Sequence, residues 1–568
     1  MAGRAVYLRT LRPVPSAGPH VIDHVQDGVY GHVATGGAWS PLSLFAASEQ
    51  GAWYDPSDFS SMFQDSAGTT PVTAVEQPVG LILDKRLGLA LGAETITNGD
   101  FSDGSTGWVF ETGWEVSGGT ATKTSGVQNA IYRNTESYIG GRTYIVELDV
   151  ISIDAGGVVY AGLGDAAASF TTTGRKKAYL KPSADTSTFY LTSQVNATLT
   201  AIDNISVREI AGNHATQATA AARPVVSARK NLFTYTEDFS NGAWTKTNGT
   251  TAVIGATAPD GTSTAWTVTL PSGSAASQLF QTLPAGTPAG LQSVYARAVG
   301  VTAGLAFGAY DGGGSGGASS SPALTSSWQR ITLATPAYTG SDRRGFWIYQ
   351  SGAATNTQVE IWHPQLEIGS TATRYQRVTT ASDYDTVGFP HYLVFDGVDD
   401  LMTTAAADFT STAAMSMFCG VKTDDDTVNV YQTAAGLGDV NSVAGSVALF
   451  TPALASTYES YARGVSANVH KTIAGSTDTS VISSLYDLGA ASGAQLGLRL
   501  NGGATSFASG ATGGGNFANA IISIGGGAGG ANKLNGNIYS LVFLGRTITD
   551  AELANTEAYI ASKSGVTL

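Results

Sequence analysis

A cluster of carboxylates at Asp396, Asp399 and Asp400 is the strongest candidate for site chemistry in this chain. Residues 392–395 alternate in side-chain direction as a strand does, and Gly397 allows the tight turn that follows. Clustered carboxylates beside a glycine suit a calcium ion, which prefers oxygen ligands. The spacing therefore predicts a strand followed by a turn, with Asp396 and Asp399 as candidate calcium ligands and turn closure as the alternative role.

Catalysis is the less favoured use of the acidic residues. Glycoside hydrolysis needs two carboxylates, and Asp399 with Asp400 or the aspartates of 424–426 are the available pairs. These pairs lie in turn-like stretches, where carboxylates are more often solvated or metal-bound. Ser315 stands in a Gly-x-Ser-x-Gly pattern without the strand and helix of a nucleophile elbow. Cys419, the single cysteine, lies in an apolar strand-like stretch that predicts a core position. We therefore expect no catalytic residue and no enzymatic activity.

Aromatic side chains are the candidates for binding sugars, because the C–H face of a pyranose stacks on a flat ring. Trp114, Tyr132 and Tyr310 are the candidate platforms. Trp108 and Trp244 occupy equivalent places in two similar stretches, which favours a shared core role for both.

The composition requires many short strands to position these residues. The chain has 568 residues, too many for a single core, and includes 70 glycines, with only 13% charged residues. Apolar residues at 42% are enough to build cores, and Thr, Val and aromatic residues at close spacing favour strands. The predicted class is all-β, with several β-sandwich or jelly-roll modules. One short C-terminal helix is predicted from a capping box at Thr549 and Glu552, with Gly565 to end it.

Charge and hydropathy exclude several classes of partner. The net charge is −14 and no run of Lys and Arg exists, so we expect no nucleic-acid partner. No stretch of eighteen apolar residues appears, so we expect no membrane insertion. The first ten residues are too polar for the apolar region of a signal peptide.

Residues 1–45 form a predicted attachment arm. Proline punctuates them and apolar residues are few, so this segment is expected to dock on another protein. His20, Asp23, His24 and His32 could bind a metal, but their spacing matches no established ligand pattern, and loop histidines are the favoured interpretation.

The run Phe-Asp-Gly-Val-Asp-Asp at 395–400 resembles the first-strand signature of laminin-G-like, concanavalin-type sandwiches in phage tail proteins. Leu83, Asp84 and Lys85 match an earlier motif of that family, and Gly-Asn-His-Ala-Thr-Gln at 212–217 matches the next. Because these motifs are far apart here, the resemblance implies a discontinuous sandwich made of residues 46–92, 212–228 and 378–568.

Two modules at 93–211 and 229–377 are predicted to interrupt that sandwich. Both open with Asp-Phe-Ser followed by a tryptophan, and both close with an alternating stretch that ends in Glu-Ile. These openings resemble those of jelly rolls of the carbohydrate-binding-module type. The resemblance implies a structural calcium at Asp100 and Asp203 of the first module. In the second module Trp362 stands where the closing aspartate is expected.

The resemblance implies a phage virion protein, a tail fibre or receptor-binding protein without enzymatic activity. It would be synthesised in the host cytoplasm, contact other virion proteins through residues 1–45, and bind host surface polysaccharide or lipopolysaccharide. Fibres gain avidity by oligomerising, so a homo-oligomer, specifically a homotrimer, is expected. The alternatives are a purely structural head or tail decoration protein and a depolymerase that acts on surface polysaccharide.

Overall fold

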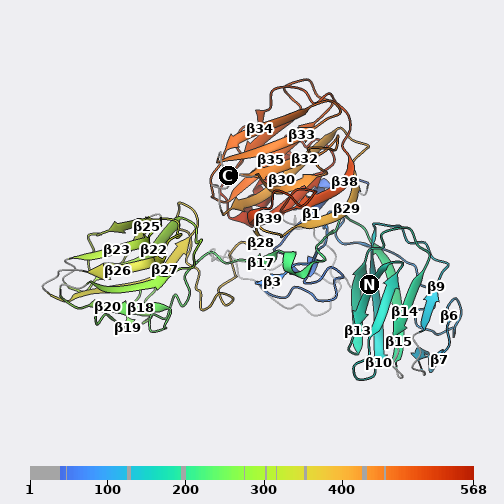
Figure 1. Ribbon diagram of the computed structural model, residues 1–568, viewed down its shortest axis with the longest axis horizontal. Helices are drawn as coiled ribbons and strands as arrows, with labels where there is room; N and C mark the ends of the chain where they lie inside the picture. The colour runs from blue at the N-terminus through green and yellow to red at the C-terminus, as the bar shows by residue number, and fades with distance from the viewer. Residues whose placement is uncertain are drawn as a thin grey trace, which may run out of the picture. The chain divides into compact units, whose positions relative to one another are not determined.

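The computed structural model describes residues 39–46, 48–123, 129–193, 200–273, 276–300, 304–314, 316–350, 355–424, 431–452 and 456–568. The chain divides into two units, Met1–Trp39 and Ser40–Leu568, and the second unit is compact. Within the described residues, six antiparallel sheets and a single α-helix make up the fold (Figure 1). The all-β class with one C-terminal helix is confirmed. Most of the predicted arm, with His20, Asp23, His24 and His32, lies outside the described residues.

The second unit begins before residue 46. The short 3-10 helix η1 (Pro41–Leu44) buries Leu44, and Nη2 of Arg546 donates a hydrogen bond of 3.0 Å to the Leu44 carbonyl. Residues from Ser40 onward therefore pack with the C-terminal part of the chain.

Two large sheets, which we call the sandwich, enclose the largest core. In spatial order the first sheet is β3 (Gln77–Pro78), β17 (Val225–Ser227), β28 (Tyr392–Asp396), β39 (Asn535–Leu544), β30 (Ala414–Thr423), β35 (Ser480–Asp487), β36 (Leu496–Leu500) and β37 (Ser506–Phe507), with β1 (Gly51–Tyr54) also paired to β39. The second is β2 (Met62–Phe63), β4 (Leu81–Ile82), β16 (Ala215–Thr216), β29 (Met402–Asp408), β38 (Asn519–Ile524), β31 (Gln432–Leu437), β32 (Val447–Thr451), β33 (Thr457–Arg463) and β34 (Asn468–Ala474).

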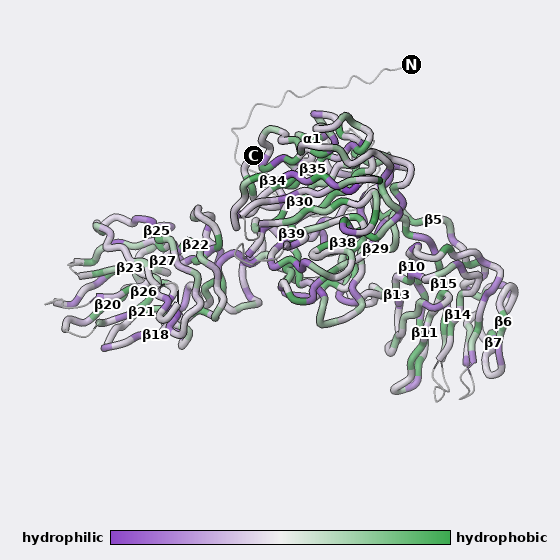
Figure 2. The backbone as a smooth tube through the Cα atoms, turned by 45° about the horizontal axis from the view of Figure 1, so that its top comes forward, coloured by the Kyte–Doolittle hydropathy of each residue, from purple (hydrophilic) through white to green (hydrophobic). Residues whose placement is uncertain are grey.

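Strands from three distant stretches of sequence share these sheets. Trp53 of β1 is opposite Val542, and Leu393 of β28 is opposite Ile538, so both strands pair with β39. Likewise β16 pairs with β4 on one side and with β29 on the other. Hydrophobic residues are frequent along β30 and part of β39, as expected for strands buried on both faces (Figure 2).

The first module is a two-sheet jelly roll inserted between β4 and β16. One sheet has the order β13 (Gly174–Leu180), β10 (Thr143–Ser152), β15 (Thr200–Ile210), β8 (Thr120–Lys123) and β7 (Trp114–Ser117), with β5 (Leu91–Glu94) also paired to β15. The other has the order β12 (Ala166–Phe170), β11 (Val159–Leu163), β14 (Phe189–Ser193), β9 (Ala130–Arg133) and β6 (Val109–Phe110).

The second module is inserted between β17 and β28 and repeats this topology. Its first sheet is β25 (Gln329–Thr335), β22 (Gly290–Ala298), β27 (Thr357–Glu367), β20 (Ala265–Leu270) and β19 (Thr251–Ala256). Its other sheet is β24 (Gly316–Ser320), β23 (Leu305–Gly312), β26 (Asp342–Gln350), β21 (Ser277–Thr282) and β18 (Trp244–Thr247). Each of these ten strands has a counterpart in the first module with the same neighbours, which is the pattern of a duplicated unit.

A buried pair of amide side chains joins the ends of the second module. Asn231 and Gln376 are fully buried. Oε1 of Gln376 accepts from the N–H groups of Lys230 and Asn231, and Nδ2 of Asn231 donates to the carbonyls of Pro364 and Gln376. These bonds hold the entry and exit of the module together.

The helix α1 (Asp550–Ser564) closes the chain as its sequence predicts. Thr549 accepts a hydrogen bond from the N–H of Glu552, the Glu552 carboxylate accepts one from the N–H of Thr549, and Gly565 adopts a left-handed conformation with φ 74°. Ile560 is buried under the helix against Gly420 of β30.

Candidate functional site

In the first module, the sheet that contains β9, β11 and β14 carries a group of tyrosines on its outer face. Tyr132, Tyr160 and Tyr190 are each partly exposed, whereas Ile131 and Leu191, their neighbours in sequence, are buried. Tyr132 lies directly opposite Tyr190 across the strand pair β9–β14. The period-2 alternation of a strand therefore turns these rings to solvent and their neighbours to the core.

A glycine allows one of these rings to lie close to the sheet. Gly162 of β11 is opposite Tyr190 of β14, and a Cβ at this glycine would lie 2.1 Å from Cζ of the tyrosine. Any other residue at position 162 would require the ring to move. The Tyr190 ring therefore covers Gly162 and presents its other face outward.

The second module repeats this arrangement on the equivalent strands. Gly308 of β23 is opposite Trp347 of β26, and a Cβ at Gly308 would lie 3.0 Å from Cε3 of that ring. Trp347 stacks on Tyr349 with ring centroids 4.0 Å apart, and Tyr310 lies 5.7 Å from Trp347. Tyr310 is 36% exposed, so this face presents three adjacent aromatic rings.

Polar side chains fix the rings of the second module. The guanidinium of Arg344 lies 5.5 Å from the centre of the Trp347 ring and 5.6 Å from that of Tyr310. Asp342 accepts from Nε and Nη2 of Arg344 at 2.8 and 2.6 Å. Oε1 of Gln278 accepts both from Arg344 and from Nε1 of Trp347. The aromatic surface is therefore held in one arrangement before any ligand arrives.

Trp114 is not available as a platform. It is only 6% exposed, belongs to the core of the first module, and donates from Nε1 to the carbonyl of Asn129 at 3.0 Å. The prediction for Trp114 is wrong because alternation along β7 directs its side chain inward. Trp108 and Trp244 are core residues, as expected, at 7% and 2% exposure.

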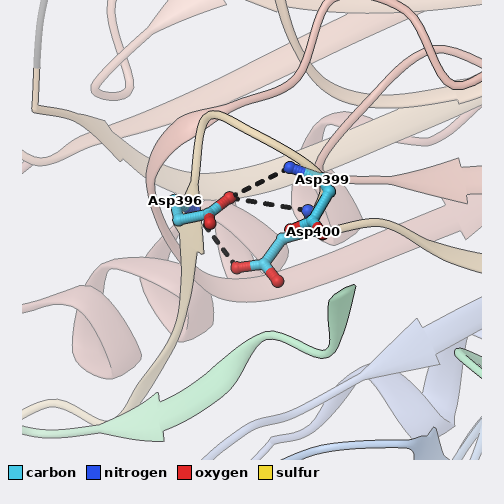
Figure 3. Close-up of side chains that lie close together, drawn as sticks. All are labelled: Asp396, Asp399 and Asp400. Atoms are coloured by element: carbon cyan, nitrogen blue, oxygen red, sulfur yellow. Dashed lines mark hydrogen bonds between the residues drawn. The ribbon is translucent and has the colours of Figure 1, made fainter. Parts of the chain in front are cut away.

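The three aspartates after β28 do gather at one point (Figure 3). One carboxylate oxygen from each of Asp396, Asp399 and Asp400 lies within 4.8 Å of the others. Oδ1 of Asp396 accepts from the N–H groups of Val398 and Asp399 at 2.8 and 3.3 Å, and Oδ2 of Asp400 accepts from the N–H of Asp396 at 3.1 Å. The cluster closes the turn and keeps free oxygen atoms that suit a calcium ion.

The electrostatic repulsion within this cluster affects the pKa of Asp400. Burial, together with the negative charges of Asp396 and Asp399, raises the pKa of Asp400 to about 6. Nζ of Lys533 donates to the carbonyl of Asp399 at 3.0 Å. A divalent cation would relieve the repulsion among the three carboxylates.

Asp100 and Asp203 are close enough to interact but form no comparable cluster. Among the described residues, Asp396, Asp399 and Asp400 are the single set of three His, Cys, Asp or Glu side chains whose ligand atoms lie close together. Burial raises the pKa of Asp203, and the charges of Asp100 and Asp149 raise it further. Asp100 accepts from the N–H and hydroxyl of Ser102, a turn-capping arrangement. Calcium at Asp100 and Asp203 stays a prediction.

Apart from Asp399 and Asp400, the sequence candidates for catalysis fall in three places. Cys419 is fully buried in β30, and burial raises the pKa of its thiol well above the usual range. Asp424 pairs with Lys422 at 2.6 Å. Ser315, Asp425 and Asp426 lie outside the described residues.

The sequence alone did not single out Tyr190, Trp347 or the two glycines opposite them. Tyr190 stands between Phe189 and Leu191, and this alternation is a signal that its ring faces outward. The pairing of Gly162 with Tyr190 depends on the register between strands, which no local pattern reports.

Comparisons with known proteins return matches among solved structures. No protein-family model and no curated protein matches the chain. The tandem CBM22-1-CBM22-2 domain of Xyn10C from Paenibacillus barcinonensis is 12% identical, with 49% of this chain and 98% of that chain covered and a TM-score of 0.24. Mouse laminin α1 domains LG4-5 are 11% identical over 50% of this chain and 88% of that chain, with a TM-score of 0.22.

The CBM40 of the Ruminococcus gnavus IT-sialidase, in a structure with α2,6-sialyllactose, is 14% identical. This match covers 26% of this chain and 84% of that chain, with a TM-score of 0.21.

No helix within the described residues is long and apolar enough to cross a membrane.

Proposed function

We propose that this protein binds glycans through one outer sheet face in each module and has no enzymatic activity. The sheet in the first module is the one that contains β11 and β14, and the sheet in the second module is the one that contains β23 and β26. The observation that carries the proposal is the aromatic ring opposite a glycine on equivalent strands, Tyr190 over Gly162 and Trp347 over Gly308. A flat ring with one open face matches the C–H face of a pyranose. Neighbouring hydroxyls, such as those of Tyr132 and Tyr310, would bond the sugar hydroxyls.

The duplication supports binding to a repetitive polymer. Two modules on one chain raise the effective concentration of the second site once the first is occupied. A surface polysaccharide or lipopolysaccharide presents many copies of one epitope and would engage both modules.

We further propose that the chain is a phage tail fibre or receptor-binding protein and acts as a homotrimer. The support is the resemblance of the 395–400 and 212–217 motifs to phage tail sandwiches. In this proposal residues 1–45 attach to other virion proteins, and calcium at Asp396 and Asp399 stabilises the turn that follows β28.

A cell-binding assay tests the proposed function. The fluorescently labelled full chain would be added to a panel of bacterial strains before and after chemical removal of surface polysaccharide. We expect binding to at least one strain, and at least a tenfold loss of binding after the polysaccharide is removed. Binding that does not depend on polysaccharide, or release of soluble sugars by the purified protein, would contradict the proposal.

A further inference from the structure

A cavity of about 850 Å³ lies where the first module meets the sandwich. This junction is well packed. Tyr179 and Ile210 of the module form an apolar cluster with Phe63, Leu81 and Leu83 of the sandwich, and the N–H of Tyr179 donates to the carbonyl of Ala67 at 2.6 Å. The cavity is therefore bounded by elements held against each other, and its volume is that of a site for a small organic ligand.

Positive charge dominates the lining of this cavity. Arg86, Arg142 and Lys181 contribute three cations against the single carboxylate of Glu209. His214 also lines it, but burial lowers the pKa of this imidazole to about 4, so the ring is neutral at pH 7. In a chain of net charge −14, such a local excess of cations favours an anionic ligand.

The three cations differ in how they are paired. Arg86 is committed to the fold, since Nε lies 3.2 Å from Oδ2 of Asp84 and Nη1 donates to the carbonyl of Glu49. Arg142 is half exposed and pairs with Glu209 at 3.0 Å. Lys181 is partly buried, and no hydrogen bond or ion pair joins its ammonium group to any other residue in the described part of the chain. Burial lowers the pKa of Lys181, a cost that a bound anion would offset.

The remaining lining suits a sugar better than an inorganic ion. Ser183 and Asn519 offer a hydroxyl and an amide, and Ile139 and Leu87 offer apolar surface. Ile139 is 41% exposed. An inorganic phosphate would fill only a small part of this volume, whereas a pyranose with a carboxylate could use the cations, the polar groups and the apolar patch together.

We propose that this cavity binds a carboxylate-bearing saccharide, with Lys181 and Arg142 contacting the carboxylate. The site is separate from the tyrosine and tryptophan faces, so it goes beyond the proposed function. A chain with both sites would distinguish acidic polysaccharides from neutral ones.

Calorimetric titration of the full chain tests this proposal with four probes: glucuronic acid, N-acetylneuraminic acid, glucose and inorganic phosphate. We expect one or both acids to bind, and glucose and phosphate to bind at least tenfold more weakly. Lys181→Gln and Arg142→Gln should each lower the affinity for the acidic sugar by about tenfold or more, because each removes a charge-assisted hydrogen bond. Added salt should also lower the affinity for the acidic sugar.

Two control variants separate this site from other effects. Lys177→Gln and Arg175→Gln each remove an exposed cation of β13 that does not line the cavity. Both should leave the affinity for the acid unchanged. Arg142 is half exposed, so its variant should fold, which thermal melting would check. Absence of binding, equal binding of glucose, phosphate as tight as the acids, or unchanged affinity in both cavity variants would overturn the proposal.

Discussion

Asp84 and His214, separated by the whole first module, bond directly to each other. The backbone N–H of Asp84 donates to Nδ1 of His214 at 2.9 Å, and Nε2 of the same ring lies 3.1 Å from the carbonyl of Ile210. The Asp84 carboxylate accepts from the N–H groups of Trp53 and Asn213. The two ends of the insertion are thus joined within the sandwich, which shows how a module of this size interrupts the sandwich without opening it.

Removing the Asp84 carboxylate should destabilise the sandwich. Asp84 is fully buried, and Asp84→Ala would leave the N–H groups of Trp53 and Asn213 without acceptors. We expect a loss of about 3 kcal/mol in the free energy of unfolding. Cys419, the single cysteine, is buried in the sandwich core, so its reaction with a thiol reagent in urea reports opening of this unit.

Asp165→Ala is the matched control for Asp84→Ala. Asp165 is exposed and accepts from the N–H of Ser183, so its loss should lower the free energy of unfolding far less than the loss of Asp84 does. Equal effects of the two variants on Cys419 protection would show that the Asp84 junction does not support the sandwich.

A fragment that contains residues 378–568 alone should not fold stably. It lacks β1, β4 and β17, and with them the buried side chains of Tyr54, Ile82 and Val226. Cys419 in this fragment should therefore react with a thiol reagent without denaturant. Fragments 93–210 and 229–377, which contain cores of their own, should unfold cooperatively. A protected Cys419 in 378–568 would contradict the discontinuous sandwich.

The stability contributed by Asp400 should depend on pH. Its pKa of about 6 in the folded protein is above the usual value of 3.8, so the folded state binds the proton more tightly. The resulting contribution to the free energy of unfolding is fully present below about pH 4 and is lost as the pH rises through 6. Asp400→Asn should therefore stabilise the protein at pH 8, measured without divalent ions, and have less effect at pH 4.

Asp408→Asn should show the opposite sign. Asp408 accepts from the N–H and hydroxyl of Thr410, and these bonds lower its pKa. Its replacement should destabilise the protein at pH 8 and matter less at pH 3. An Asp400→Asn variant that is less stable than the wild type at pH 8 without divalent ions would contradict the raised pKa.

Calcium should raise the melting temperature of the protein if it binds to the aspartate cluster in the turn that follows β28. A ligand that binds only the folded state stabilises it in proportion to the logarithm of its concentration. Asp399 is exposed and its carboxylate closes no turn bond, so Asp399→Asn should fold normally and lose the calcium response. Asp203→Asn tests the first module in the same way. A calcium shift that persists in Asp399→Asn would place the ion elsewhere.

Local patterns predicted the strands and turns well. Alternation at 392–395 and the aspartates that follow predicted β28 and its turn, and the duplicated Asp-Phe-Ser openings predicted two similar modules. These features depend on neighbours in sequence, so a local signal carries them. The same alternation also holds for Trp114 and Val116, and it directs Trp114 inward.

Features that need tertiary contacts were not predictable from the sequence. The glycine at 162 and the ring at 190 meet only through the register of β11 and β14. The cavity beside Lys181 exists only because the first module packs on the sandwich. Similarly, the bond from Arg546 to the Leu44 carbonyl, which ties residues 41–44 to the sandwich, joins positions at opposite ends of the sequence.

Glycan affinity of ring variants tests the central claim most directly. Purified surface polysaccharides from a strain that binds the full chain would be immobilised and titrated with wild type, Tyr190→Ala, Trp347→Ala and the double variant. Stacking of one ring contributes about 1 kcal/mol, so each single variant should bind several-fold more weakly, and the double variant at least tenfold more weakly. Thermal melting should show that all the variants stay folded. Unchanged affinity in the double variant, with stability lowered instead, would show that both rings only cover their glycines and would contradict the account.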